Sequence, residues 1–502
     1  MSNFQIEEAT IGDIHAAYRD GSLTCRQLVE SYMARIDAYD RSGPTINSIV
    51  TVNPRALEEA EDLDAEFART GELSGPLHGI PVVVKDQVET KGIMTTFGSI
   101  ALDGYVPEED ATAIAQLRQA GAVILAKTAM PDFATSWFGY SSKSGETKNP
   151  YALDRDPGGS SGGTGAAVAA NLGTVGIGED TGGSIRVPGS FNNLVGLKVT
   201  PGLISRKGLS PLVVFQDSAG PMARTVTDAA ILLDALVGYD PVDPYTATYV
   251  IARVPGSFTE HLDPDGLRGA RIGVVRDVFG SGENPDAAAV NRVIETALEA
   301  MRSAGAELID VAIPDLAHWI DFTSLYIAHS KHDINKFLAA RPQLPVRSVE
   351  EIFKSKQYHP ALDHPALDLF RAIVLGPTDP RDDPAYFEKY AAREEFQRLV
   401  VNIMATNGLS ALCFPSVQVV PPTREEIDAG RWPTLAFPTN TLIGAQTWMP
   451  AMTLPAGFTE QGIPVGLEFL ALPYGEPTLF RLGFSFEQAT RHRRPPTSTP
   501  TL

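Results

Sequence analysis

Two short glycine-and-serine clusters hold the side chains best suited to chemistry. The first is GGSSGG, from Gly158 to Gly163, and the second is Gly182-Gly183-Ser184. Glycine is used this densely where the backbone bends sharply or approaches another group, because each glycine loses much backbone entropy on folding. The pattern indicates a site built from serine hydroxyls and backbone N–H groups, with a tight flexible loop as the plain alternative.

Motifs that share this composition fit the clusters poorly. A phosphate-binding loop requires lysine where Thr164 stands, and a dinucleotide-binding fingerprint requires glycine where Thr181 stands. Gly158–Gly162 matches the Gly-x-Ser-x-Gly pattern of a nucleophile elbow, which would make Ser160 the nucleophile. An elbow follows directly on a strand, however, and residues 149–157 read as a loop. The elbow interpretation therefore lacks the element that should position it.

The segments around the clusters alternate between strand and helix patterns. Apolar runs of strand length occur at 80–84, 122–127 and 173–178, and helix patterns occur at 112–120 and 165–170. A strand–helix–strand unit follows at 270–276, 287–304 and 306–311. This alternation predicts an α/β fold with a mixed, mostly parallel central sheet that is covered by helices on both faces.

The chain is predicted to form a single domain of residues 1–502. Residues 1–70 read as N-terminal helices, with Thr10 and Thr24 as N-caps. Residues 75–235 form the core that holds both clusters. Residues 316–404 carry longer helical patterns that predict a helical cap, and residues 405–502 return to strands and a closing helix.

Composition narrows the class of protein. Hydrophobic residues make up 43% of the 502 residues and the formal charge is −20, which predicts a soluble protein and disfavours nucleic acid or an anionic membrane as partner. The N-terminus lacks the layout of a signal peptide and no long apolar run occurs, so a cytoplasmic location is expected. Two distant cysteines, Cys25 and Cys413, provide neither a disulfide framework nor a zinc site.

Three segments in this order resemble the amidase signature family. They are GPLHGIPVVVKD at 75–86, DPGGSSGGTGAAVAA at 156–170 and GEDTGGSIRVPGSFNNLVGLKVTPG at 178–202. The resemblance extends over nearly the whole chain and is weakest from 316 to 404. It implies the α/β fold of that family and hydrolysis of amides without a metal or organic cofactor.

The same resemblance assigns roles to the motif residues. Ser184 is the expected nucleophile, Ser160 the proton relay after a cis Gly159–Ser160 peptide bond, and Lys85 the base. The oxyanion hole is expected from the backbone N–H groups of Thr181, Gly182, Gly183 and Ser184. Ser161, Asp180 and Arg186 are expected to support this arrangement.

The assignment of Lys85 makes a physical demand. A lysine acts as a base only when it is neutral, so burial or nearby positive charge must lower its pKa. Val82, Val83 and Val84 supply apolar surroundings. Asp86 would oppose the shift, but successive side chains of a strand point to opposite faces, which separates Asp86 from the amine.

The substrate pocket is expected where residues 131–144 and 319–326 meet the triad. Aromatic side chains that could line it are Phe133, Trp137, Phe138, Tyr140 and Trp448, although aromatic residues also fill protein cores. They favour a small neutral, apolar or aryl amide, with a carbamate or an ester as alternatives on the same site.

A second class of function comes from the same family, which includes the glutamine-hydrolysing subunit of a tRNA-dependent amidotransferase. The segment 437–457 departs from what that subunit leads us to expect, so a stand-alone hydrolase is favoured. We expect a small-molecule partner only, and a monomer or homodimer.

Overall fold

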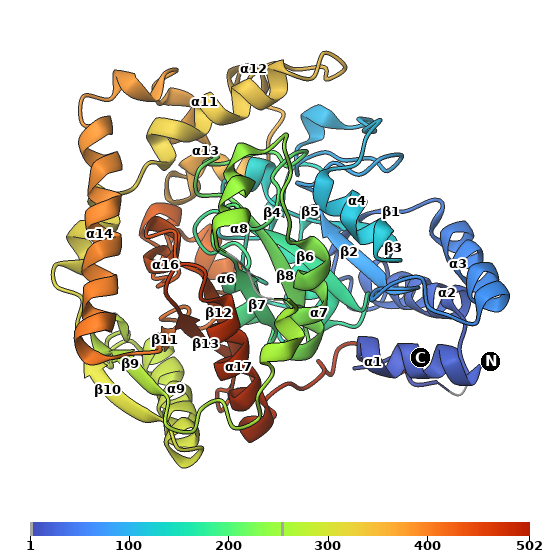
Figure 1. The fold of residues 1–502 in the computed structure, drawn as a ribbon. Helices are drawn as coiled ribbons and strands as arrows, with labels where there is room; N and C mark the ends of the chain where they lie inside the picture. Colours follow the sequence, from blue (N-terminus) through green and yellow to red (C-terminus); the bar gives the residue numbers. More distant parts are fainter. Residues whose placement is uncertain (1–3, 253–255) are drawn as a thin grey trace.

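Within residues 4–252 and 256–502, which the computed structural model describes, eleven strands form one central sheet (Figure 1). The strand order is β1-β3-β2-β6-β8-β7-β12-β13-β11-β9-β10, and β4 and β5 form a separate small hairpin. The strands are β1 Ile49–Val52, β2 Pro81–Lys85, β3 Val123–Thr128, β4 Tyr140–Ser141, β5 Gly145–Glu146, β6 Val175–Asp180, β7 Val195–Lys198, β8 Ser218–Ala223, β9 Arg271–Val275, β10 Glu307–Val311, β11 Ala411–Pro415, β12 Ala451–Phe458 and β13 Pro464–Leu470.

Parallel pairing is concentrated in two blocks of the sheet. Strands β3, β2 and β6 are parallel neighbours, and so are β11, β9 and β10. The pairs between these blocks, and β1 with β3, are antiparallel. The prediction of one large α/β domain around a mixed sheet is confirmed, and the first parallel block is the part that carries the site.

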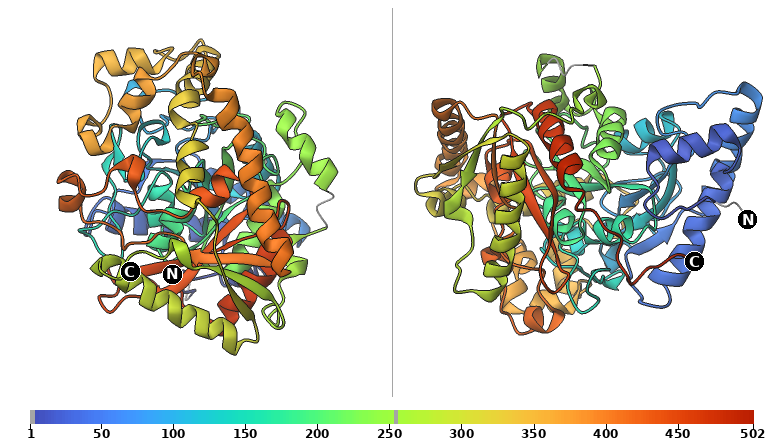
Figure 2. Two further views of the ribbon diagram at one scale, coloured as in Figure 1. Left: turned by 90° about the vertical axis from the view of Figure 1, so that its left-hand side faces the viewer. Right: turned by 90° about the horizontal axis from the view of Figure 1, so that it is seen from below.

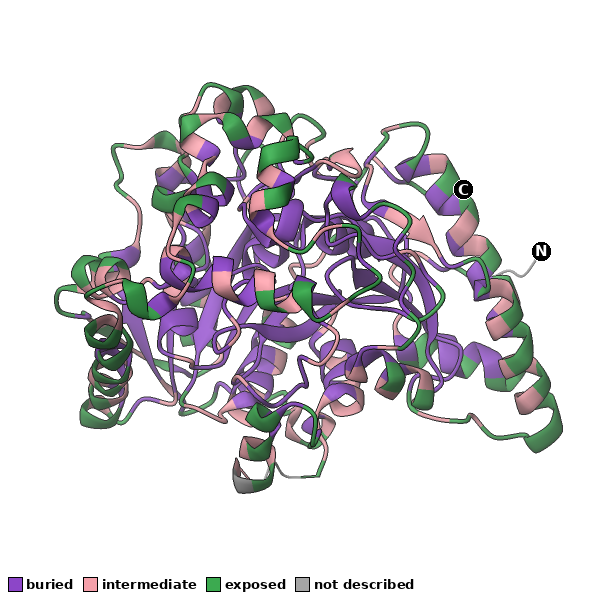
Figure 3. Ribbon diagram, turned by 90° about the horizontal axis from the view of Figure 1, so that it is seen from above, coloured by how far each residue is buried: buried purple, intermediate pink, exposed green. Residues whose placement is uncertain are grey.

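Helices cover both faces of the sheet, as the alternation along β11 demonstrates. Ala411 and Cys413 belong to the large core that includes residues of α9 and α17, whereas Leu412 and Phe414 pack in a second cluster with residues of α14. Successive strand residues point to opposite faces, so both faces are buried. Figure 3 shows the buried sheet at the centre and exposed residues on the outer helices.

The helices are bounded by the local signals that the sequence contains. As predicted, Thr10 and Thr24 cap α1 and α2 by accepting the N3 amide. Gly21 ends α1 in a left-handed conformation. The helices are α1 Ile11–Asp20, α2 Cys25–Arg35, α3 Ala56–Thr70, α4 Thr112–Gln119, α5 Gly162–Ala169, α6 Arg186–Phe191, α7 Val226–Leu236, α8 Ala247–Ala252, α9 Pro285–Ser303, α10 Leu316–Phe322, α11 Tyr326–Ala339, α12 Val349–Ser355, α13 Leu369–Leu375, α14 Tyr386–Asn407, α15 Arg424–Asp428, α16 Leu442–Gln446 and α17 Glu476–Thr490.

The region 316–404 is helical and contains α10 to most of α14 (Figure 1). Ile334, Leu338 and Phe370 pack in a hydrophobic cluster that also contains Phe97 and Phe133 from the N-terminal half. The region therefore lies against the segment that leads to the first serine cluster.

The C-terminal segment returns to the N-terminal helices, on the same side of the molecule (Figure 2). Arg35 of α2 donates hydrogen bonds to the carbonyl oxygens of Thr499 and Pro500 at 2.9 Å each. Both cysteines are free and buried. None of the helices in the described ranges combines the length and the apolar character that crossing a membrane requires.

Candidate active site

The site forms where two parallel strands end and two helices begin. Lys85 is the last residue of β2, and Asp180 is the last residue of the adjacent strand β6. Ser160 lies shortly before α5, and Ser184 lies shortly before α6. In parallel sheets the carboxyl ends of the strands and the helix N-termini meet at one edge, which is where functional groups gather. The fold thus places Lys85 at the same edge of the sheet as Ser160 and Ser184, which lie in a distant segment of the chain.

Lys85 and Ser160 are in direct contact. Lys85 Nζ lies 2.8 Å from Ser160 Oγ, and both side chains are fully buried. The Gly159–Ser160 peptide bond is cis, as the resemblance implied. A Cβ atom on Gly159 would lie 2.8 Å from the carbonyl oxygen of Ser136, so only glycine fits beside this segment.

Ser184 stands at the end of the second glycine cluster and lines a cavity together with Gly182. The amide of Ser161 donates to the carbonyl oxygen of Ser184 at 3.0 Å, which joins the two serine segments directly. In the described part of the chain, the amide N–H groups of residues 181–184 donate to no protein acceptor. These four donors are therefore available to an oxygen atom bound beside Ser184.

Gly182 and Gly183 are required by close approaches from the other side of the cavity. A Cβ on Gly182 would lie 2.2 Å from Tyr326 Oη, and a Cβ on Gly183 would lie 2.0 Å from Thr441 Oγ1. Real Cβ atoms do not come this close, so a larger residue would shift either the turn or the facing side chain. The glycines therefore let Tyr326 and Thr441 pack closely against the turn that carries Ser184.

Asp180 and Arg186 hold the turn that carries Ser184. Asp180 accepts from the Ile185 amide at 3.1 Å and pairs with the Arg186 guanidinium at 3.0 Å. Arg186 also binds Glu468 at 2.6 Å and the Thr441 carbonyl oxygen at 2.8 Å, and its side chain is fully buried. The contacts of Arg186 thus connect Asp180 to β13 and to the loop before α16.

Ser161 fixes the end of β6 beside Ser160. Its hydroxyl donates to the Glu179 carbonyl oxygen at 3.1 Å and accepts from the Glu179 amide at 3.2 Å. This reciprocal pair holds the end of β6 against the turn before α5.

Burial lowers the pKa of Lys85 below its ordinary value, while the neighbouring carboxylates of Glu179, Asp180 and Asp217 oppose that shift. Asp86 points away, as predicted, and accepts from the Thr96 amide at 2.9 Å. Sequence reasoning missed Glu179, whose carboxylate lies 3.3 Å from Lys85 Nζ. The sequence does indicate that Glu179 is buried. It lies two positions after the apolar Ile177 in a strand, so its side chain points to the same side as that of Ile177.

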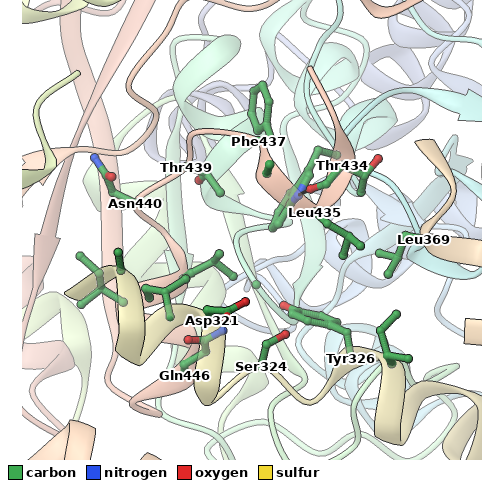
Figure 4. Close-up of a pocket in the computed structure, with 18 of the residues that line it drawn as sticks. Asp321, Ser324, Tyr326, Leu369, Thr434, Leu435, Phe437, Thr439, Asn440 and Gln446 are labelled. Atoms are coloured by element: carbon green, nitrogen blue, oxygen red, sulfur yellow. Dashed lines mark hydrogen bonds between the residues drawn. The ribbon is translucent and has the colours of Figure 1, made fainter. Parts of the chain in front are cut away.

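The cavity above Ser184 has a volume of about 1290 Å³. Ala134, Ser136 and Trp137 line it from one of the two segments expected to form the substrate pocket, and Ile320, Asp321, Ser324 and Tyr326 line it from the other. A third wall, residues 434–446, was not foreseen. Figure 4 shows Thr434, Leu435 and Phe437 across the cavity from Asp321, Ser324 and Tyr326.

The predicted aromatic lining needs correction. Of the five residues proposed, Trp137 lines the cavity, and its indole donates to the Thr434 carbonyl oxygen at 2.8 Å. The other four lie outside the cavity lining in the described structure, because they pack against other rings. Phe133 stacks on Phe97, Phe138 meets Phe437 edge to face, Tyr140 packs on His359 and donates to Asp428, and Trp448 packs on Phe215 and Tyr390.

Comparison with known proteins decides the family. The sequence profile described as Amidase matches residues 27–480. The chain belongs to the Amidase family. It is 33% identical to a probable amidase of Arabidopsis thaliana, with 99% of this chain and 92% of the relative covered. It is also 33% identical to a glutamyl-tRNA(Gln) amidotransferase subunit of Alkalilimnicola ehrlichii, with 98% and 99% covered.

Solved structures of Amidase-family enzymes share the fold. The peptide amidase of Stenotrophomonas maltophilia superposes with a TM-score of 0.85 at 35% identity, covering 98% of this chain and 99% of that one. A peptide amidase bound to the competitive inhibitor chymostatin gives a TM-score of 0.87 at 36% identity, with 98% and 100% covered. These similarities support amide hydrolysis as the reaction class. Within the described residues, no cluster of three or more His, Cys, Asp or Glu side chains is placed to hold a metal ion.

Proposed function

We propose that this Amidase-family enzyme cleaves the C–N bond of an amide through an acyl-enzyme on Ser184. Ser160 relays protons, Lys85 is the base, and the N–H groups of Thr181, Gly182, Gly183 and Ser184 form the oxyanion hole. The observation that carries the proposal is the 2.8 Å contact between Lys85 Nζ and Ser160 Oγ beside the turn of Ser184. A buried amine in contact with a hydroxyl is suited to activating a serine, which is a weak nucleophile without a base.

Acylation follows from this geometry. Ser184 Oγ attacks the carbonyl carbon while its proton passes to Ser160 Oγ, and the proton of Ser160 passes to Lys85 Nζ. The electron pair of the C=O bond moves to the oxygen, where the four amides stabilise the negative charge. One such donor contributes about 3–4 kcal/mol in the transition state.

Collapse of the tetrahedral intermediate breaks the C–N bond, and Lys85 returns the proton through Ser160 to the leaving nitrogen. A water molecule then attacks the acyl-enzyme with the same relay as base, and the acid is released from Ser184. Lys85 and Ser160 therefore act first as the base and then as the acid, because the proton that they take up from Ser184 is the one that they return to the leaving nitrogen.

The cavity favours a neutral or positively charged amide of more than minimal size. Its volume of about 1290 Å³ exceeds the roughly 300–1,000 Å³ of ordinary small-molecule sites. Apolar side chains such as Trp137 and Leu435 line it, while the exposed carboxylates of Asp315, Asp321 and Asp382 lie among its lining residues. Similarity to peptide amidases adds support for an amide carried on an extended molecule. We therefore propose the terminal carboxamide of a short apolar or basic peptide, together with apolar aryl amides.

A substrate panel tests this proposal. It contains amidated dipeptides and tetrapeptides with apolar, basic or acidic side chains, aryl and aliphatic amides, carbamates, esters and glutamine. We expect the highest kcat/KM for apolar or basic amides and the lowest for acidic ones. Equal rates for acidic and basic peptide amides would contradict the substrate assignment, and absence of hydrolysis of any amide would contradict the reaction.

A glutamine-hydrolysing component of an amidotransferase is the second candidate, favoured by the 33% identity to such a relative over nearly the full length of both chains. The structural similarity to the peptide amidase, with a TM-score of 0.85, supports the stand-alone hydrolase. The departure expected for segment 437–457 from its sequence favours the same choice. Glutamine hydrolysis that exceeds hydrolysis of every other amide in the panel would reverse this choice. We propose a monomer or homodimer that works without a partner protein.

A further inference from the structure

A buried carboxylate touches the proposed base, and the reaction described above does not use it. Glu179 Oε2 lies 3.3 Å from Lys85 Nζ, and neither side chain is exposed. Lys85 Nζ also donates to the Glu179 carbonyl oxygen at 3.0 Å, so one residue holds the amine at two points. Lys85 Nζ therefore contacts two side chains, those of Ser160 and Glu179.

Glu179 is itself fixed by a second hydroxyl. Thr181 Oγ1 lies 3.1 Å from Glu179 Oε1 and donates to Asp217 Oδ1 at 2.6 Å. Asp217 is held in turn by the backbone amides of Leu212 and Val213 at 2.9 and 3.1 Å. A continuous chain of contacts thus runs from Ser160 through Lys85 and Glu179 to Asp217.

The other charged groups nearby have partners of their own. Asp180 and Glu468 both bind Arg186, and Lys198 donates to the carbonyl oxygens of Val199 and Met449. The remaining titratable groups that face this cluster are Asp217, Tyr326 and, behind Tyr326, Arg393. Among the described residues, Lys85 is therefore the one cation in contact with the Glu179 carboxylate.

The two groups depend on each other because both are removed from water. Burial lowers the pKa of Lys85 and raises the pKa of Glu179, and each group favours the charged form of its partner. Burial raises the pKa of Asp217 well above its ordinary value, and repulsion from Glu179 adds to the shift. An unpaired buried charge is costly, so an ammonium that forms at Lys85 needs a carboxylate beside it.

We propose that Glu179 is a positioning residue that acts through Lys85, holding the amine against Ser160 and stabilising the ammonium that forms during attack. This inference rests on the proposed function of Lys85 as base. Before attack, the pair consists of a neutral amine and a carboxylate. When the proton of Ser184 arrives through Ser160, the pair becomes an ammonium and a carboxylate, and the negative charge appears on the carbonyl oxygen of the substrate. Charge is conserved within the site and no further reactant is needed.

The pH dependence of kcat/KM tests the proposal with Glu179→Gln, which keeps the shape and removes the charge. Without the carboxylate the Lys85 ammonium is less favoured, so we expect the acid limb to move to lower pH by about 1–3 units. We also expect kcat on the plateau to fall about tenfold or more, because a base with a lower pKa accepts a proton less readily. KM should stay the same, because Glu179 does not line the cavity.

A merely structural role predicts a different result. In that case Glu179→Gln would lower the thermal stability and leave the acid limb unchanged, which would overturn the proposal. Glu179→Met is nearly the same size, carries no charge and has only a weakly accepting sulfur. It is expected to shift the acid limb in the same direction and serves if the glutamine variant fails to fold. Asp228→Asn is the matched control, because Asp228 is a buried carboxyl outside the site. The acid limb of the kcat/KM profile of this variant should match that of the wild type.

Lys85→Ala separates this inference from the function on which it rests. If Lys85→Ala is inactive while Glu179→Gln leaves the limb unchanged, the base assignment stands and the role of Glu179 is wrong. If Lys85→Ala hydrolyses amides at the wild-type rate, the proposed function itself is wrong.

Discussion

Lys85 and Ser160 lie in contact, with 2.8 Å between Nζ and Oγ, although 75 residues separate them in the chain. One residue ends a strand of the parallel block, and the other precedes the helix that packs on that block. Neither side chain reaches solvent. A lysine in this position loses the hydration of its ammonium, so its surroundings favour the neutral amine that proton transfer requires.

Replacing Lys85 by methionine is expected to remove amide hydrolysis without unfolding the protein. General-base catalysis contributes typically 10²–10⁴-fold, so we expect kcat/KM to fall by at least that range. The loss should be smaller for activated esters, whose leaving groups need no proton. Steady-state kinetics on an amide and on the matching ester measure both effects.

The control is a second buried lysine one strand away. Lys127 of β3 donates to Thr95 at 2.9 Å, lies 3.7 Å from Asp86, and is fully buried. Lys127→Met should lower stability by leaving Asp86 unpaired, while each folded molecule keeps its activity. Equal loss of activity in the two variants, per folded molecule, would indicate that Lys85 has a structural role.

Gly182→Ala is expected to lower kcat about 10²-fold, because the added Cβ would collide with Tyr326 Oη at 2.2 Å and displace the amides proposed to bind the oxyanion. Adding Tyr326→Phe removes that oxygen, and the double variant should regain part of the lost rate. The kinetics of both single variants and of the double variant form a double-mutant cycle that measures the coupling between the two positions. Full activity of Gly182→Ala would show that these amides do not contact the reacting oxygen.

Arg186→Met is expected to lower the free energy of unfolding by about 3–5 kcal/mol, because Asp180 and Glu468 would be left as buried carboxylates without their partner. Arg186→Lys should rescue little, since an ammonium cannot reproduce the forked contacts of the guanidinium. Arg398→Met is the control, because Arg398 forms an exposed pair with Glu394 and should lose less than about 1 kcal/mol. Urea denaturation measures all three, and similar losses at both arginine sites would contradict this account.

Asp228→Asn is expected to gain stability relative to the wild type as the pH rises from 4 to 7. Burial raises the pKa of Asp228 from 3.8 to about 6, so the folded wild type holds this proton after the unfolded chain has released it. Stability of the wild type therefore falls with rising pH through this window, by about 3 kcal/mol for two pKa units. Unfolding at pH 4 and pH 7 measures the difference, and a gap independent of pH would contradict the shift.

The sequence was sufficient for the parts of the fold that depend on local signals and strong patterns. Thr10 and Thr24 cap their helices because a hydroxyl before an amphipathic run satisfies free amides, and this signal is local. The strand–helix–strand unit of β9, α9 and β10 was also predicted, because its apolar periodicity changes clearly. The cytoplasmic location and the oligomeric state stay predictions.

The residues that line the cavity could not be predicted from the sequence as well as the helices and strands. Aromatic residues such as Phe133 and Phe138 have the same identity in a core as in a pocket, and only tertiary packing decides between them. The wall of residues 434–446 comes from a distant segment with no motif. Glu179 was not predicted because its contact with Lys85 joins the ends of two neighbouring strands, β2 and β6, and only the folded sheet brings these ends together.

The most direct test of the central claim is the position of the acyl group on the enzyme. Wild-type enzyme quenched during turnover of a slowly hydrolysed ester is digested with trypsin and analysed by mass spectrometry. Residues 156–186 contain no internal cleavage site, so both serines lie on one peptide and fragmentation must locate the adduct. We predict the acyl group on Ser184 in the wild type and in Ser160→Ala, and none in Ser184→Ala. An adduct on Ser160, or unchanged turnover by Ser184→Ala, would contradict the account.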